Sequence, residues 1–187
     1  MINHETPIAG VYAVETTPVG DHRGMFARCF CQEELAPILK HRTIRQINFS
    51  RTTSVGAIRG MHFQQPPYAE MKLIRCLRGR VWDVAVDLRA NSPTFLQWHA
   101  EELSATKMRM FVIPEGCAHG FQVLDPESEL LYLHTAMYNK ASEGAVRYND
   151  TRLSIPWPIP VTDLSERDLN HPLLSASYTG IELPTNH

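Results

Sequence analysis

The stretch from Lys72 to Leu88 constrains the fold most, because apolar and polar residues alternate along both of its halves. The first half reads KLIRCL and the second reads VWDVAVDL, with Arg78-Gly79-Arg80 between them. A period of two places every second side chain on one face, as in a half-buried strand, and the central glycine suits a turn. The pattern predicts a β-hairpin with one buried face. His62 and Arg59 precede it and could share a pocket with Lys72.

Further segments alternate in the same way, and they are residues 8–17, 44–50, 96–103, 108–113 and 129–138. A short helix is expected over residues 31–40, where Pro37 would cut it short, and a second helical segment begins at Ser165, a serine followed by an acid three residues later. Many short strands with little helix indicate an all-β sandwich or barrel. The 187 residues suit a single domain over residues 1–187.

Several polar positions on these strands have two interpretations. Gln46, Asn48 and Ser50 share one face of a strand, and the pattern favours solvent over a pocket for them. Tyr132 and Tyr138 share a face with His134 in the segment 129–138, which suits either an aromatic core or a functional role. Arg23 stands beside Gly24, which is compatible with a solvated loop and with a tight turn at a site.

The overall charge limits the partners. A formal net charge of −2 and a pI near 6.5 argue against a nucleic-acid surface but permit a local basic pocket for a small anion. No apolar run approaches the roughly 18 residues of a membrane span, and no signal peptide begins the chain, so a cytoplasmic protein without membrane contact is expected. The four cysteines form no CxxC pair and are expected to be reduced.

Two short patterns resemble the half-motifs of the cupin type of jelly roll. Gly56 is followed after five residues by His62, and Pro114-Glu115-Gly116 is followed by His119. Metal-binding cupins carry a second histidine two residues after the first, where this chain has Gln64. A donor set that includes this amide suits an iron site poorly. The resemblance therefore implies a cupin-like jelly roll without a metal.

Within that group, the chain resembles the nucleotide-sugar epimerases typified by dTDP-4-dehydrorhamnose 3,5-epimerase. The similarity runs through nearly the whole length, and no single motif is specific by itself. The matching motifs are DHRGMF at 21–26, QINFS at 46–50, RGMHFQ at 59–64, KLIRCLRGRVWDVAVDLRANSPTF at 72–95, IPEGCAHGFQVL at 113–124, YLHTAMY at 132–138 and SERD at 165–168.

The resemblance implies epimerisation at C3 and C5 of a dTDP-4-keto-6-deoxyhexose, without a cofactor. His62 matches the base and Asp168 the carboxylate that orients it, a role that suits an imidazole titrating near neutrality. Lys72 matches the cation that stabilises the enolate, and Tyr132 matches the general acid.

The resemblance also implies binding residues and a dimer. Arg23 and Arg59 match diphosphate and sugar contacts, since a guanidinium can bind two oxygens at once. Tyr138 matches the residue that stacks on the nucleotide base. Other substrate-lining positions are matched by Gln46, Asn48, His119 and Glu143. Family members are homodimers that exchange N-terminal strands, so Arg23 would serve the partner's site.

Two positions depart from the family pattern and leave the substrate open. Arg28 stands where many relatives have an acid, and Glu70-Met71 precedes Lys72 where a glutamine and a small residue are common. The nearest alternative is an epimerase that inverts a single centre of this or another nucleotide sugar. A metal-dependent cupin oxygenase and a sugar-nucleotide binder without catalysis are the alternatives from other classes.

Overall fold

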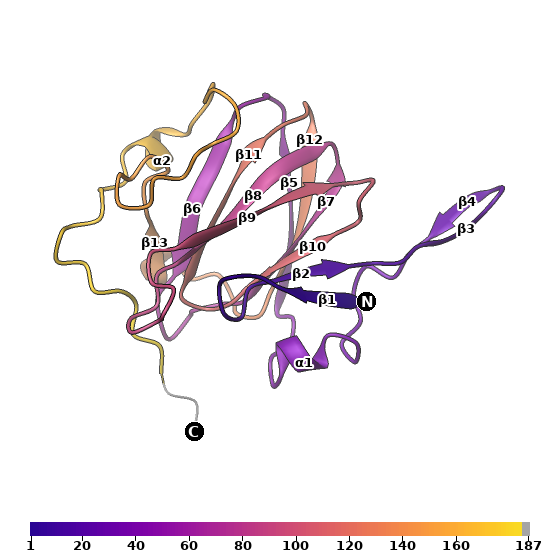
Figure 1. The fold of residues 1–187 in the computed structure, drawn as a ribbon, viewed down its shortest axis with the longest axis horizontal. Coiled ribbons are helices and arrows are strands. Elements are labelled where there is room, and N and C mark those ends of the chain that lie inside the picture. Colours follow the sequence, from indigo (N-terminus) through magenta and orange to yellow (C-terminus); the bar gives the residue numbers. More distant parts are fainter. Residues whose placement is uncertain (185–187) are drawn as a thin grey trace.

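Two antiparallel sheets that pack face to face form the body of the computed structural model, which describes residues 1–184 (Figure 1). The six-stranded sheet contains, in spatial order, β1 (Ile2–Glu5), β2 (Tyr12–Glu15), β10 (Met110–Ile113), β7 (Lys72–Arg78), β12 (Ser128–His134) and β5 (Gln46–Thr52). The five-stranded sheet contains β13 (Glu143–Ala145), β6 (Ile58–Gln64), β11 (Cys117–Val123), β8 (Arg80–Asp87) and β9 (Trp98–Ser104). The predicted all-β, cupin-like jelly roll is confirmed.

The hairpin predicted over residues 72–88 is wrong, although both of its strands exist. β7 belongs to the six-stranded sheet and β8 to the five-stranded sheet, so the chain crosses between the sheets at Gly79. Gly79 has a φ of 73°, and a Cβ atom there would lie 2.4 Å from the Ser128 hydroxyl oxygen. Alternation in a sequence defines which face of a strand is apolar, but it does not define which strand is its neighbour.

Three apolar clusters fill the body. The first lies between the sheets and includes Phe111, Phe121 and Leu130. The second covers the outer face of the five-stranded sheet, where C-terminal residues such as Leu153 pack on it. The third covers the outer face of the six-stranded sheet, against which Leu35 packs. Because both faces of each sheet are covered in places, several strands are buried along their whole length, as β11 is.

The helical segments are short. They are α1 (Ala36–Leu39), the 3-10 turn η1 (Lys140–Ser142) and α2 (Glu166–Leu169). The helix predicted over residues 31–40 covers only Ala36–Leu39. Pro37 lies in its first turn, where the missing N–H costs no intrahelical hydrogen bond, so it stands at the start of the helix and does not cut it short as predicted. Ser165 caps α2 as predicted, since its hydroxyl accepts a hydrogen bond from the Asp168 backbone N–H at 3.1 Å. None of the helices among the described residues is long and apolar enough to cross a membrane.

Some strand boundaries differ from the predicted ones. In the segment 129–138, β12 ends at His134, so Tyr138 lies beyond the strand and does not share its face with Tyr132. In the segment 8–17, only Tyr12–Glu15 forms a strand, and it pairs with β1, which was not predicted.

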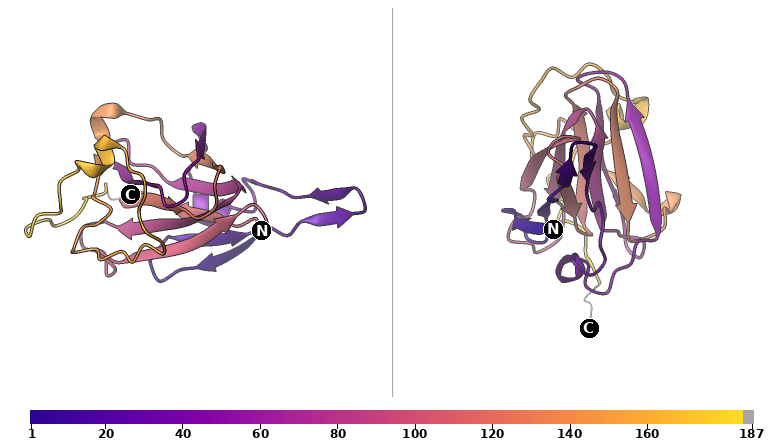
Figure 2. Two further views of the ribbon diagram at one scale, coloured as in Figure 1. Left: turned by 90° about the horizontal axis from the view of Figure 1, so that it is seen from above. Right: turned by 90° about the vertical axis from the view of Figure 1, so that its right-hand side faces the viewer.

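A two-stranded arm projects from the body. It consists of β3 (Val19–Asp21) and β4 (Gly24–Phe26), which pair only with each other among the described residues. Figures 1 and 2 show the arm extending well beyond the two sheets. Arg23 lies at its tip with its side chain 80% exposed and paired with Asp21.

Candidate active site

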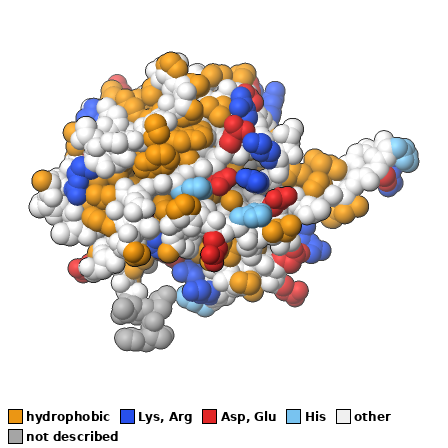
Figure 3. All heavy atoms as spheres, in the orientation of Figure 1, with side chains coloured by type: hydrophobic (Ala, Val, Ile, Leu, Met, Phe, Trp, Pro, Cys, Tyr) orange, Lys and Arg blue, Asp and Glu red, His pale blue; other side chains and the backbone are white. Residues whose placement is uncertain are grey.

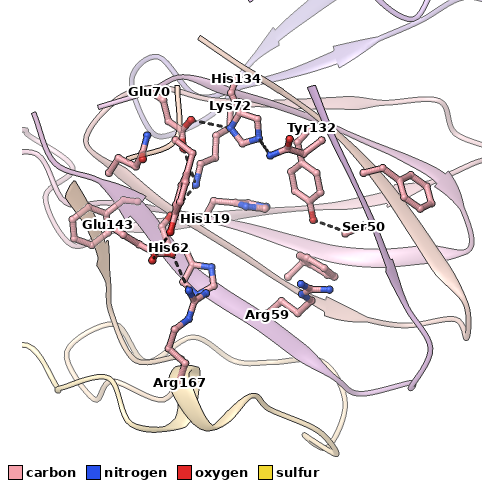
Figure 4. A pocket seen from close by; sticks show the side chains of 16 residues that line it. Ser50, Arg59, His62, Glu70, Lys72, His119, Tyr132, His134, Glu143 and Arg167 are labelled. Atoms are coloured by element: carbon pink, nitrogen blue, oxygen red, sulfur yellow. Dashed lines mark hydrogen bonds and ion pairs between the residues drawn. The ribbon is translucent and has the colours of Figure 1, made fainter. Parts of the chain in front are cut away.

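A cavity of about 310 Å³ opens between the two sheets, and side chains from both sheets line it (Figure 4). Of the predicted site residues, eight line this cavity: Asn48, Arg59, His62, Lys72, His119, Tyr132, Tyr138 and Glu143. Asp168 lies directly behind His62, and Gln46 acts through a backbone contact described below. Arg23 is the exception, because it lies on the arm, outside this cavity.

His62 and Asp168 form a close pair at the floor of the cavity. His62 projects from β6, and its Nε2 atom lies 2.7 Å from Asp168 Oδ1. Asp168 is buried, and its second oxygen accepts a hydrogen bond from the Gly60 backbone N–H at 3.4 Å. Because an ionised carboxylate only accepts hydrogen bonds, the proton of a neutral His62 lies on Nε2 and Nδ1 is free to take another.

Arg167 joins this pair to the rim of the cavity. Its guanidinium lies 3.2 Å from His62 Nε2 and 3.0 Å from Glu143 Oε1. The Tyr138 hydroxyl donates to the other oxygen of Glu143 at 3.2 Å. Tyr138 is more than half exposed. Sequence reasoning did not single out Arg167, although it lies within the SERD motif.

Lys72 lies on the six-stranded sheet and points toward His62. Its Nζ atom donates to the His62 backbone carbonyl at 3.2 Å and lies 3.5 Å from Glu70 Oε1. The Lys72 side chain is only 11% exposed. Burial lowers the pKa of Lys72, and the nearby carboxylates, Glu70 first, oppose that shift.

Tyr132 also comes from the six-stranded sheet, across the cavity from His62 (Figure 4). Its hydroxyl lies 3.0 Å from the Ser50 hydroxyl. Burial raises the pKa of Tyr132, so the phenol stays protonated near neutral pH. Tyr132 thus lines the cavity and also packs against the first apolar cluster, so both interpretations of this residue keep support, while Tyr138 lies at the rim.

His119 is the register partner of His62 on the neighbouring strand β11. It is buried, and its Nε2 atom lies 2.8 Å from Asp83 Oδ1. Burial raises the pKa of Asp83, and the other oxygen of this carboxylate has no hydrogen-bond partner among the described residues. Asp83 was not predicted as a site residue, since it reads as one polar position in an alternating strand.

Glu70 and His134 form a further histidine–carboxylate pair at the top of the cavity (Figure 4). His134 Nδ1 lies 2.8 Å from Glu70 Oε2, and Asn48 Nδ2 lies 3.4 Å from His134 Nε2. Neither Glu70 nor His134 was predicted to belong to the site. Two sequence signals could have found them: Glu70 departs from the family pattern, and His134 shares a strand face with Tyr132.

The polar face of β5 borders the cavity and also meets solvent, so the prediction that it faces solvent is only partly right. Asn48 and Ser50 line the cavity, as does Phe49 from the other face. Asn48 is nevertheless exposed, as are Ile47 and Phe49, at 61% and 58%. Gln46 supports the cavity from one step away, since its side-chain oxygen accepts a hydrogen bond from the Tyr138 backbone N–H at 3.1 Å.

Potential metal ligands gather at one place. His62, Asp168 and His171 bring their ligand atoms within 4.8 Å of one another. The pair of His62 and Asp168 is already joined by a hydrogen bond, and the Arg167 guanidinium supplies a positive charge beside it. Gln64, the residue at the second cupin position, instead binds the backbone of Tyr68, Met137 and Asn139. The site without a metal stays a prediction.

Comparisons with known proteins agree with this geometry. The family model described as dTDP-4-dehydrorhamnose 3,5-epimerase matches residues 5–176. The protein of that name from Shigella flexneri is 41% identical over 167 residues, which cover 89% of this chain and 92% of the relative.

Solved structures resemble the fold over the same extent. A dTDP-6-deoxy-D-glucose-3,5-epimerase from Legionella pneumophila, in complex with dTDP-4-keto-L-rhamnose, has a TM-score of 0.87 and 37% identity, covering 92% of both chains. A 3′-monoepimerase from Streptomyces bikiniensis, in complex with dTDP-quinovose, has a TM-score of 0.85 and 32% identity, covering 91% of this chain and 86% of the other. The chain therefore belongs to the dTDP-4-dehydrorhamnose 3,5-epimerase family.

Proposed function

We propose that the protein inverts C3 and C5 of a dTDP-4-keto-6-deoxyhexose without a cofactor. One observation carries this proposal: the His62 imidazole, paired with Asp168 of α2, and the Tyr132 phenol come from opposite sheets and face the same cavity. Inversion at carbon needs a base on one side of the sugar and an acid on the other. Members of the family named above share this activity in their names, and the Legionella structure holds such a sugar nucleotide.

The first step is removal of the proton next to the C4 ketone by His62. Burial lowers the pKa of His62, and Asp168 opposes this shift, so the imidazole is neutral and able to accept a proton near pH 7. When the proton arrives on Nδ1, the Asp168 carboxylate stabilises the resulting imidazolium through the 2.7 Å contact. The electron pair of the broken C–H bond moves into the enolate.

The enolate carries its negative charge on the C4 oxygen, and Lys72 is the cation placed to receive it. Its ammonium is buried between the sheets, where a fixed positive charge interacts more strongly than it would in water. Tyr132 then donates its phenolic proton to the carbon from the opposite face, which completes the inversion, and solvent restores the protonation states.

The nucleotide part is proposed to bind at the rim. Tyr138 offers an exposed ring for stacking on the base, and Arg59 offers an exposed guanidinium for the diphosphate. Asn48, His119 and Glu143 line the sugar pocket, and Gln46 holds the backbone of Tyr138.

The active unit is proposed to be a homodimer formed by strand exchange. Val19, Met25 and Phe26 are between 64% and 77% exposed on the arm, which is costly for a monomer in water. Figure 3 shows hydrophobic side chains near the base of the arm and charged and histidine side chains at its tip. In a dimer, the arm would place Arg23 at the partner's cavity.

A single-centre epimerase is the second candidate. The Streptomyces 3′-monoepimerase superimposes nearly as well as the 3,5-epimerases, so the fold does not distinguish one inverted carbon from two.

The test is incubation with dTDP-4-keto-6-deoxyglucose in deuterated water with excess EDTA, with deuterium at C3 and C5 followed by NMR and mass spectrometry. Label at both carbons is expected, with none in His62→Ala. Tyr132→Phe should retain exchange of deuterium but lose inversion, because abstraction uses His62 and the opposite-face proton comes from Tyr132. Label at one carbon would assign the single-centre reaction, and activity that disappears with EDTA would contradict the proposal.

A further inference from the structure

Glu70 lies buried between two groups of the cavity, Lys72 and His134. Its Oε1 atom is 3.5 Å from the Lys72 ammonium and its Oε2 atom is 2.8 Å from His134 Nδ1. Only 8% of the Glu70 side chain and 11% of the His134 side chain are exposed. A carboxylate this far from water is costly unless both of its oxygens are satisfied, and here each has its own partner.

The hydrogen bonds around Glu70 have a consistent direction. The Asn48 amide can only donate through Nδ2, so His134 Nε2 is the acceptor at 3.4 Å. His134 Nδ1 must then carry the proton, which it donates to Glu70 Oε2. Because a neutral His134 donates a hydrogen bond but carries no charge, the negative charge of Glu70 is balanced by Lys72. The sheet enforces this arrangement, because His134 on β12 is the register partner of Lys72 on β7.

Lys72 has three N–H bonds, and the protein constrains two directions around it. One N–H donates to the His62 carbonyl at 3.2 Å, and Glu70 attracts the ammonium from the other side. The remaining N–H can donate to a ligand in the cavity, which Lys72 and Glu70 both line (Figure 4).

We propose that Glu70, held by His134, is a positioning residue that aims the Lys72 ammonium at the reacting oxygen of the substrate. This inference rests on the proposed function, in which Lys72 stabilises the enolate. It gives a role to Glu70, which departs from the family pattern: the carboxylate orients the cation that lines the cavity, Lys72. Glu70 acts only through Lys72.

The electrostatic surroundings agree with this role. The charged groups that act on Lys72 are Glu70, Glu143 on β13 and Asp83 on β8, while His62, His119 and His134 line the cavity around it. Burial alone raises the pKa of Glu70, but the hydrogen bond from His134 and the charge of Lys72 together lower it. Glu70 is therefore ionised at neutral pH, and it favours the charged form of Lys72.

The first experiment measures the protonation of Lys72 directly in Glu70→Gln, with ¹³C-labelled lysine followed by NMR during a pH titration. The chain contains only Lys40, Lys72, Lys107 and Lys140, so the signals are few. Glu101→Gln is the matched control, since Glu101 also pairs with a histidine, His99, at 2.9 Å but does not line the cavity. We expect the Lys72 titration to move to lower pH in Glu70→Gln only, and an unchanged titration would overturn the proposal.

The second experiment measures turnover in the same variants. In Glu70→Gln, kcat should fall about tenfold or more with little change in KM, and the alkaline limb of the kcat profile should move to lower pH. His134→Gln, whose amide can still donate to Glu70, should lie closer to the wild type than His134→Leu. Equal losses in Glu70→Gln and Glu101→Gln would overturn the proposal. If the wild type fails to turn over dTDP sugars, the proposed function fails, while the NMR titration still decides the role of Glu70.

Discussion

At the scale of single residues, the proposed role of His62 as a base requires an imidazole that is neutral near pH 7 and can accept a proton. Burial lowers the pKa of His62, and the charges of Arg167 and Lys72 lower it further, while Asp168 raises it. Burial works against ionised Asp168, yet His62, the Gly60 backbone N–H and the Arg167 charge together outweigh it and lower the pKa of Asp168 to about 2. The carboxylate is thus ionised throughout the neutral range, when it must hold the imidazole.

Asp168→Asn should lower kcat by a factor on the order of 10², because the amide holds the ring but cannot stabilise the imidazolium. Since Asp168 raises the pKa of His62, its loss lowers that pKa, so the acidic limb of the kcat/KM profile should move to lower pH. The measurement is a pH profile of wild type, Asp168→Asn and the control Asp163→Asn, which changes an exposed aspartate of the same segment. An acidic limb that stays in place would contradict the assigned pair.

The sequence motifs predicted half of the residues that line the cavity and the pairing of His62 with Asp168, but not the partners of Lys72 and His119. His62, Lys72, Tyr132 and Asp168 stand in recognisable motifs, so resemblance alone placed them. Asp83, Glu70 and His134 meet their partners only after folding, since Glu70 and His134 are 64 positions apart. No local periodicity contains that information, because the contact depends on the pairing of β12 with β7.

At the scale of elements, the local sequence patterns identified where strands lie better than they identified which strands pair with each other. β5, β7, β8, β9, β10 and β12 each lie largely within a predicted segment. The hairpin prediction failed because Gly79 connects strands of opposite sheets, and the prediction of solvent for the polar side of β5 missed that this side also borders the cavity. Both errors concern the neighbours of a strand, and these depend on the tertiary structure and not on the local sequence pattern.

Gly79→Ala tests the importance of that crossing. The backbone has a φ of 73°, and the new Cβ would lie 2.4 Å from the Ser128 hydroxyl oxygen and 3.1 Å from its Cα. We expect the free energy of unfolding to fall by about 1–3 kcal/mol, from the left-handed conformation and the crowding together. Thermal unfolding of Gly79→Ala is compared with Arg78→Ala, an exposed neighbour. Equal stability of the two variants would contradict this prediction, because it would mean that the backbone at position 79 accommodates a Cβ atom without a loss of folding free energy.

At the scale of the whole molecule, the body and the arm place different demands on the chain. The body encloses a cavity that is lined by the residues predicted as base, acid and cation, all of them from one chain. The arm holds Arg23 outside that cavity, and exposed apolar residues lie on the arm and on the edge strand β5. The sequence could not reveal that the arm is separate from the body, because an apolar residue in an alternating segment is expected to be buried until the fold is known.

Mixed dimers test whether Arg23 serves the partner's cavity. Arg23→Ala and His62→Ala should each impair their own homodimers, the first by weakening substrate binding and the second by removing the base. A mixed dimer, purified with a different tag on each chain, would hold one cavity with both residues intact. It should recover about half of the wild-type activity, as one of two symmetric sites is restored.

The control is a mixed dimer of Lys72→Ala and His62→Ala, two residues that line the same cavity of one chain. No cavity of that dimer is complete, so it should stay inactive. If the Arg23→Ala mixture recovers no more activity than this control, the arm does not deliver Arg23 across a dimer. A monomer in sedimentation velocity at micromolar concentration would lead to the same conclusion independently, because a site completed by a second copy requires a stable pair.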